Sequence, residues 1–207
     1  LGVTAGWLSF LGTSAVRFLM PFYLQRVLGY SPREVGLLMI PPALCLAVLG
    51  PISGGLSDRF GWRWFTMGGL ALSAAAWFVL AASLTENSSL LLIVSMLALQ
   101  SAGTGLFNTP NNSSILSAVE RSSYGVVSAL TQLVRNSANV TSIAMATTVV
   151  VVTMGSMGVE PRLDAASPEV ATAFVAGLHR AFILLGTLLL VGAAISFLKG
   201  GRPRESA

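Results

Sequence analysis

Long apolar stretches alternate with short polar connections along most of this 207-residue chain. A helix needs roughly 20 consecutive apolar residues to cross the hydrocarbon of a bilayer, and six segments of the chain meet this requirement. The predicted spans lie near Val3–Leu28, Val35–Leu56, Trp64–Ser83, Leu90–Asn108, Val126–Met154 and Ala181–Leu198. The pattern predicts an all-α fold in which residues 1–207 form one polytopic bundle of six transmembrane helices.

The composition supports a membrane protein and excludes several other classes. Only 10% of the residues are charged, whereas soluble domains carry about 25%. The basic residues are dispersed, so the net charge of +4 does not indicate nucleic-acid binding. With Cys45 and His179 as the lone cysteine and histidine, we expect no disulfide, metal site or cofactor. The chain also lacks a paired-carboxylate, Ser-His or nucleotide-binding motif, so we do not expect an enzyme.

The distribution of charges selects an orientation. With the connection that contains Asp58 on the cytoplasmic side, more basic residues lie inside and most acidic residues lie outside, as the positive-inside rule requires. The basic residues placed inside are Arg59, Arg63, Arg121, Lys199, Arg202 and Arg204. The charged residues placed outside are Arg26, Arg33, Arg162, Arg180, Glu34, Glu86, Glu160, Asp164 and Glu169. We expect the C-terminus to be cytoplasmic as well.

Prolines and glycines predict local irregularities. Pro41 and Pro42 suggest a bend in the second span. The motif Gly50-Pro51-Ile52-Ser53-Gly54-Gly55 is interpreted as a local softening of the same helix. In the longest connection, residues 155–180, the dipeptide Pro168-Glu169 predicts the start of a short amphipathic helix that leads into the last span.

A short charged turn separates the second and third predicted spans. Its sequence is Gly54-Gly55-Leu56-Ser57-Asp58-Arg59-Phe60-Gly61-Trp62-Arg63. This stretch resembles the cytoplasmic signature loop of the major facilitator superfamily, G-x-L-(A/S)-D-R-x-G-(R/K)-(R/K). It departs from that pattern at Trp62, where the family usually has a basic residue. So short a turn leaves no room for a domain, and the flanking helices must be antiparallel neighbours.

The resemblance covers nearly the whole chain and is most like the fourteen-span drug:proton antiporters. The further matching segments are Pro21-Phe22-Tyr23-Leu24-Gln25, Leu28-Gly29-Tyr30-Ser31-Pro32, Pro110-Asn111-Asn112-Ser113, Ile115–Val119, Arg135-Asn136 and Ala173–Phe182. The resemblance implies a C-terminal six-helix half built from two inverted three-helix units. In such a half the first and fourth helices line the central cavity, the second and fifth contact the other half, and the third and sixth face lipid.

Polar residues within the first and fourth spans are candidates for the cavity wall. A charge at Arg17, inside the first span, should face protein or water rather than lipid. It could attract an anionic group or pair with a carboxylate of the other half; a structural ion pair or snorkelling remains open. The fourth span carries a polar stripe at helical spacing, formed by Gln100, Thr104, Asn108 and Asn111. We predict that Gln100 and Thr104 line the cavity with Asn108, although Asn108 could also serve packing or a gate.

The fifth span carries a second polar stripe. Its members Ser128, Gln132, Arg135, Asn139 and Ser142 recur at steps of four and three residues. The resemblance implies that this face meets the other half. We therefore predict that Gln132, Arg135, Asn136 and Asn139 are interface or gate residues, with purely structural hydrogen bonding as the alternative.

The signature turn is the predicted gate. An ionised Asp58 is favoured near a helix N-terminus by the free N–H groups and the helix dipole. The resemblance implies that this carboxylate, with Arg59, engages the half-to-half interface and stabilises the outward-facing state. Gly54 and Gly61 permit close approach and a tight turn, and Arg63 adds a further charge.

The predicted function is transport by alternating access in a bacterial inner membrane, with proton-coupled efflux of drugs or other small amphipathic compounds. The partners would be a small-molecule substrate, protons, the lipid bilayer and a missing N-terminal half, since the chain begins at Leu1. Because none of the spans has an Asp or Glu in its core, the proton-carrying carboxylate would lie in that other half. The alternatives are a facilitator for a sugar or metabolite and a membrane scaffold without transport activity.

Overall fold

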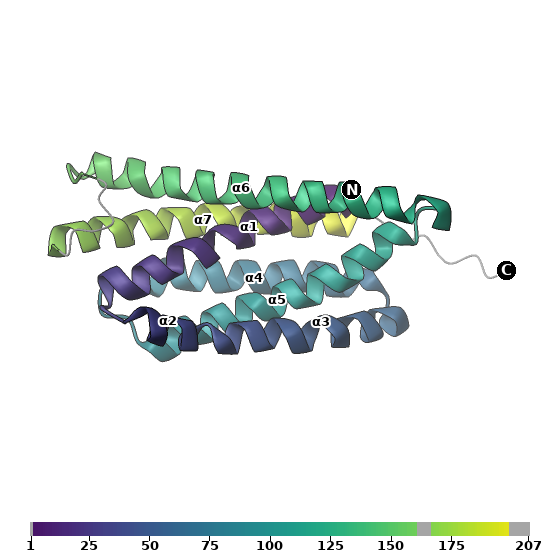
Figure 1. Ribbon diagram of the computed structural model, residues 1–207, viewed down its shortest axis with the longest axis horizontal. Coiled ribbons are helices and arrows are strands. Elements are labelled where there is room, and N and C mark those ends of the chain that lie inside the picture. The colour runs from purple at the N-terminus through teal and green to yellow at the C-terminus, as the bar shows by residue number, and fades with distance from the viewer. Residues whose placement is uncertain (1, 161–166, 199–207) are drawn as a thin grey trace.

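The computed structural model describes residues 2–160 and 167–198 and consists of six long helices with short connections (Figure 1). The long helices are α1 (Gly2–Phe22), α3 (Ile40–Phe60), α4 (Trp62–Ser83), α5 (Leu90–Leu116), α6 (Tyr124–Ser156) and α7 (Pro168–Leu198). Three shorter elements are the π-helical turn η1 (Tyr23–Val27), α2 (Pro32–Leu38) and the 3-10 turn η2 (Arg121–Ser123). Among the described residues, six helical segments are long and apolar enough to cross a membrane, which confirms the predicted fold class.

Two helices are longer than the apolar pattern predicts. The fourth predicted span ends near Asn108, but α5 continues to Leu116. The last predicted span begins near Ala181, but α7 is continuous from Pro168, so the expected short helix and the last span are one helix. Several charges used for the predicted orientation lie outside the described residues: Arg162, Asp164, Lys199, Arg202 and Arg204.

The six helices pack as a sequence of neighbours that leaves one face partly open. Helix α5 lies between α3 and α4, α4 packs on α7, and α7 contacts both α6 and α1. Helix α1 also packs against α6 along its length and touches α5. In Figure 1, α6, α7 and α1 lie above α4, α5 and α3, with the helices running along the long axis. Between α4 and α7, the rings of Trp77 and Phe182 stack with centroids 5.4 Å apart.

The second span is interrupted where the sequence predicts a bend. Helix α2 begins with a capping box, in which the backbone N–H of Ser31 donates to Glu34 Oε2 at 2.8 Å and the Glu34 N–H donates to Ser31 Oγ at 3.4 Å. It ends at Leu38, and α3 starts at Ile40 with Pro41 in its first turn. Proline is favoured there because the first-turn N–H groups have no intrahelical acceptor.

Small residues bring two helix pairs into close contact. A Cβ on Gly103 of α5 would lie 2.5 Å from the carbonyl oxygen of Gly69 of α4, so backbone packs directly on backbone at this crossing. At the α3–α5 crossing, Ser53 Oγ donates to the carbonyl oxygen of Gly105 at 2.9 Å. A Cβ on Gly54 would lie 2.8 Å from Thr109 Cγ2. The Gly-Pro-rich stretch of α3 therefore forms a helix–helix contact, in addition to any softening of the helix.

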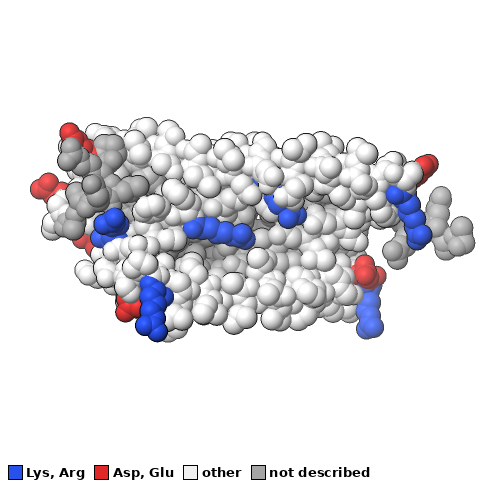
Figure 2. All heavy atoms as spheres, viewed as in Figure 1, with Lys and Arg blue, Asp and Glu red and all other residues white. Residues whose placement is uncertain are grey.

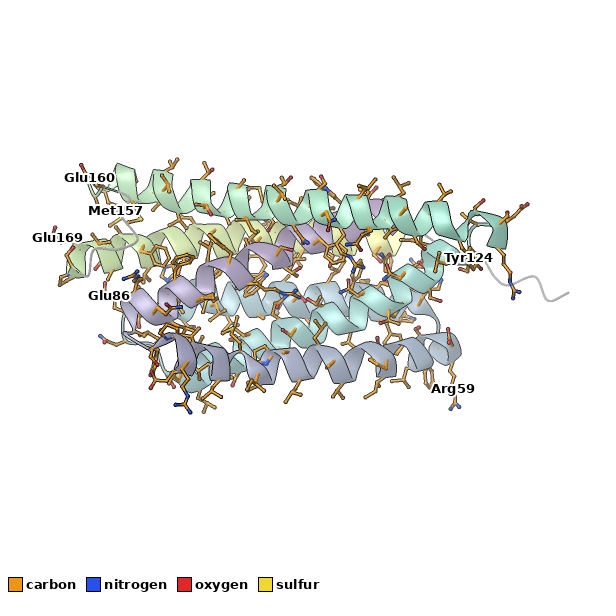
Figure 3. All side chains as sticks on the ribbon, viewed as in Figure 1. Arg59, Glu86, Tyr124, Met157, Glu160 and Glu169 are labelled. Atoms are coloured by element: carbon orange, nitrogen blue, oxygen red, sulfur yellow. The ribbon has the colours of Figure 1, made fainter. Side chains whose placement is uncertain are left out.

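Polar side chains hold the connection between α4 and α5 at one end of the bundle. The Tyr23 hydroxyl donates to the carbonyl oxygen of Thr85 at 2.6 Å. His179 Nε2 lies 2.6 Å from the carbonyl oxygen of Leu84, and Thr172 Oγ1 donates to Glu86. Figure 3 places Glu86, Glu160 and Glu169 at this end and Arg59 at the other.

Candidate functional site: a mostly apolar cavity between three helices

A cavity of about 350 Å³ lies where α1, α3 and α5 face one another. Most of its lining is apolar, and the polar side chains in it belong to Arg17, Gln100, Thr13 and Ser101. The other lining residues are Val16, Met20, Pro21, Met39, Pro42, Ala43, Leu46 and Leu97. This combination of an apolar wall with few polar groups is typical of small-molecule sites, which measure about 300–1,000 Å³.

Arg17 brings a positive charge to the middle of α1. Its side chain is exposed in this bundle and lines the cavity. None of the described residues forms a hydrogen bond, an ion pair or a ring contact with its guanidinium group. In Figure 2 most charged side chains lie at the two ends of the bundle, and basic side chains also lie on the hollowed middle of the face in view. A charge at this depth is costly unless water, protein or a ligand accompanies it.

The polar stripe of α5 divides into two parts. Gln100 and Thr104 are buried and joined, since Gln100 Nε2 donates to Thr104 Oγ1 at 2.9 Å. Of this pair, Gln100 lines the cavity. Asn108 is half-buried and is not among the lining residues, and Asn111 is buried with its Nδ2 3.3 Å from the position of a Cβ on Gly6. The end of the stripe at Asn111 therefore packs toward α1.

The polar stripe of α6 is bound mainly to α1 of the same bundle. The Ser14 hydroxyl donates to Asn139 Oδ1. Ser142 Oγ donates to the carbonyl oxygen of Leu11 at 2.5 Å and accepts from the backbone N–H of Ala15 at 3.0 Å. Ser142 thus contacts two backbone groups of α1 that lie four residues apart, the spacing of partners in an α-helix.

The remaining predicted interface residues lie around a second cavity. This cavity of about 220 Å³ is lined by Asn112, Ile115 and Leu116 of α5 and by Ser128, Thr131, Gln132 and Arg135 of α6. Gln132 Nε2 donates to Asn136 Oδ1 at 3.2 Å, and both side chains are exposed. The guanidinium carbon of Arg135 lies 4.6 Å from the centre of the Phe10 ring, and Arg135 Nε is buried without a hydrogen-bond acceptor.

The predicted signature loop is mostly helical. Helix α3 continues to Phe60, and the chain reverses at Gly61, whose φ of 88° is a conformation that favours glycine. Helix α4 begins at the next residue. Asp58 and Arg59 are exposed, and the carboxylate of Asp58 contacts no partner in the part of the chain that the structure describes. Both charges are therefore available to a surface beyond this bundle.

The sequence predicts that Arg63 adds its charge to the Asp58 turn, but in the structure its side chain contacts Phe197 of α7. Its Nη2 donates to the carbonyl oxygen of Phe197 at 2.6 Å, and its guanidinium carbon lies 4.4 Å from the centre of the Phe197 ring. It therefore binds the C-terminal turn of α7, where a cation is favoured by the helix dipole. Nothing in the local sequence could reveal this contact, because 134 residues separate the partners.

Trp77 is a further residue that the sequence did not single out. Its Nε1 donates to the carbonyl oxygen of Gly12 at 2.7 Å, one residue from the Leu11 carbonyl that Ser142 binds. A buried tryptophan needs such an acceptor. The α1 segment next to the cavity is therefore bound from α4 and α6 together.

Comparisons with known proteins give the family. The model of the Major Facilitator Superfamily matches residues 2–207. The riboflavin transporter RibZ of Clostridioides difficile is 34% identical over 122 residues, which are 59% of this chain and 26% of RibZ. The multidrug resistance protein Stp of Mycobacterium tuberculosis is 29% identical over 71% of this chain and 27% of Stp.

The methyl viologen resistance protein SmvA of Salmonella typhimurium is 38% identical over 39% of this chain and 16% of SmvA. The matched regions thus cover less than a third of each of these three relatives. Since the family model matches the chain from residue 2 to its last residue, this integral membrane protein belongs to the Major Facilitator Superfamily of transporters.

Proposed function

We propose that this chain is the C-terminal half of a transporter that exports small amphipathic compounds by alternating access in exchange for protons. The observation that carries the proposal is the cavity between α1, α3 and α5, which combines an apolar wall with Arg17 and Gln100. A half-site of this kind needs a second bundle to close around a substrate. The names of Stp and SmvA, a multidrug and a methyl viologen resistance protein, support export of drug-like compounds.

The exposed surfaces of α3 and α6 are suited to contact a second bundle. On α3 the exposed apolar side chains include Leu44, Val48, Ile52 and Leu56, and on α6 they include Val126, Leu130, Leu133 and Val140. In the apolar 18-residue stretch of the span Pro32–Phe60 only 17% is buried within this bundle, against 61% in the corresponding stretch of the span Val3–Val27. We propose that these two helices carry the interface between the halves, with Asp58 and Arg59 at its gate.

The proposed orientation places the Asp58–Arg59 end in the cytoplasm of a bacterial cell. Support comes from the charges at the two ends: Glu86, Glu160 and Glu169 lie at the end away from Arg59 (Figure 3). The sequence also assigns six basic residues to the Asp58–Arg59 side and four to the other, and an excess of Lys and Arg is usual on the cytoplasmic side.

Proton exchange would depend on a carboxylate outside this chain. All acidic residues that the structure describes lie in connections or near helix ends: Glu34, Asp58, Glu86, Glu120, Glu160 and Glu169. A carboxylate that carries protons across a membrane needs a raised pKa, which burial in the membrane interior provides. We place it in the other half of the transporter.

Inverted membrane vesicles that contain the complete gene product test the proposal. Respiration acidifies the vesicle lumen and quenches a pH-sensitive acridine dye. Compounds exported in exchange for protons should restore the fluorescence, and vesicles without the protein supply the control. A panel of ethidium, methyl viologen, fluorescein and riboflavin covers cationic, anionic and neutral compounds. Absence of any response, together with absence of uptake of these compounds, would rule out proton-coupled export of the panel.

A metabolite is the second candidate cargo, because RibZ is named as a riboflavin transporter. Riboflavin combines an apolar ring system with a polar chain, which the mixed lining of the cavity could accept. Uptake of riboflavin by the vesicles without any response to the drug-like compounds would favour this candidate.

A further inference from the structure

Two arginines of the long helices line cavities at different heights of the bundle. Arg17 lines the larger cavity between α1, α3 and α5, and Arg135 lines the smaller cavity between α5 and α6. Arg135 lies over the ring of Phe10, which precedes Arg17 by seven residues, or about 10 Å, along α1. Arg135 therefore lies closer to the N-terminal end of α1 than Arg17 does.

Neither cavity contains a compensating acid. The lining residues of both cavities include no Asp or Glu, and no described carboxylate pairs with either guanidinium group. The Phe10 ring accommodates the charge of Arg135 through a cation–π contact, but Arg135 Nε still lacks an acceptor. Arg17 keeps all of its N–H donors free within the described residues. Each group therefore supplies a positive charge and unused N–H donors at its own cavity.

We propose that the cargo is an amphipathic organic anion, a compound that joins a carboxylate, sulfonate or phosphate to an apolar ring system. This inference rests on the proposed transport function and narrows its substrate class. The guanidinium fork of Arg17 binds the acidic group through paired N–H donors, a geometry suited to carboxylate and phosphate oxygens. The ring system packs on Met20, Leu46 and Leu97, and Arg135 attracts the anion from the narrower cavity.

A carboxylate from the rest of the transporter is the competing partner for Arg17. An ion pair of that kind would make Arg17 a structural residue, and its loss would impair transport of every compound regardless of charge. An anion-binding Arg17 affects anions selectively. The two roles therefore predict different patterns for cargoes that share a scaffold and differ in charge.

Fluorescein and rhodamine 123 supply such a pair, because both are xanthene dyes of similar size, the first anionic and the second cationic at neutral pH. Transport of each dye is measured in inverted vesicles that contain the complete gene product or its R17Q, R17K or R26Q variant. Arg26 is exposed in η1 and is absent from the cavity lining, so R26Q removes a charge without touching the site. Monodisperse elution in detergent checks that each variant is folded.

We expect the unaltered protein to transport fluorescein in preference to rhodamine 123. R17Q should lower fluorescein transport at least tenfold without lowering rhodamine 123 transport, R17K should restore part of the activity, and R26Q should stay within twofold. Equal loss of both dyes in R17Q, or unchanged fluorescein transport, overturns the inference. Preference for rhodamine 123 in the unaltered protein overturns it and leaves the transport function standing.

If neither dye is transported, the other compounds of the first panel test the inference. Transport of its cations alone overturns the inference. Complete inactivity toward the panel, with folded protein in the vesicles, removes the proposed function and this inference together.

Discussion

Ser142 of α6 binds the carbonyl oxygen of Leu11 in α1, and the same hydroxyl accepts the backbone N–H of Ala15. These two backbone groups would bind each other in an uninterrupted α-helix. A side chain of a neighbouring helix therefore completes the hydrogen bonding of α1 just before Arg17 enters the cavity.

Replacement of Ser142 by alanine should destabilise the bundle modestly. The variant loses an interhelical contact, and interhelical hydrogen bonds in membrane proteins contribute about 0.6 kcal/mol on average and up to about 1.7 kcal/mol. Thermal unfolding in detergent measures the change. Ser137→Ala is the matched control, because Ser137 is an exposed serine of the same helix with no hydrogen bond in the described part of the chain. Equal melting temperatures for the two variants would contradict the structural role of Ser142.

Replacement of Arg63 should destabilise the protein, whereas replacement of Arg59 should not. Arg63→Gln removes the contact with the last turn of α7 and should lower the free energy of unfolding by about 1 kcal/mol, as expected for a cation at a helix C-terminus. Arg59→Gln should leave stability unchanged, because Arg59 is exposed and unpaired within the described residues. Unfolding curves of both variants in the same detergent compare them. Unchanged stability of Arg63→Gln would contradict a stabilising role of the contact between Arg63 and Phe197.

The crossing of α4 and α5 should tolerate no added methyl group. A Cβ on Gly103 would lie 2.4 Å from Ser73 Oγ and 2.5 Å from the carbonyl oxygen of Gly69. Gly103→Ala should therefore cost about 1–3 kcal/mol, as overpacking of a tight interior does. Gly68→Ala is the control, since nothing lies within 4 Å of that position and alanine favours a helix by about 1 kcal/mol over glycine. If Gly103→Ala were as stable as the unaltered protein, α4 and α5 could not be packed as closely as the structure shows.

The sequence predicts the spans because crossing a bilayer demands long apolar runs, but it locates their ends poorly. Helix α5 extends past Asn108 to Leu116, and α7 begins at Pro168. Helical hydrogen bonds join backbone groups, so a helix can continue through polar residues once it leaves the hydrocarbon. Hydropathy therefore marks the membrane-embedded part of each helix and not its full length.

The sequence identifies polar faces but not their partners. Helical spacing correctly groups Gln100 with Thr104, which are hydrogen-bonded in the structure. Spacing also groups Asn139 with the polar face of the fifth span, which the family resemblance assigns to the half-to-half interface, yet its oxygen accepts a hydrogen bond from Ser14 of the same bundle. The partner depends on how distant segments pack, and 125 residues separate these two. The interface and gate assignments stay predictions.

Asp58 should matter for transport and not for the stability of this bundle. It is exposed near the end of α3, and no group in the described residues pairs with its carboxylate. Asp58→Asn keeps the size of the side chain and removes its charge, so any contact within this bundle changes little. If the carboxylate holds the gate between two halves, the variant should reach the membrane in normal amounts and lose most of its export activity.

Glu120→Gln provides the matched control for this prediction. Glu120 is an exposed acid in the connection between α5 and η2, near the end of the bundle at which Figure 3 shows Arg59 and Tyr124. Loss of its charge alters the local potential as Asp58→Asn does, but should leave export within twofold of the unaltered protein. Export rates normalised to the amount of protein in the vesicles compare the two variants. Normal export by both variants would remove the gating role of Asp58. Equal loss of export in both variants would assign the effect to the net charge of this end of the bundle.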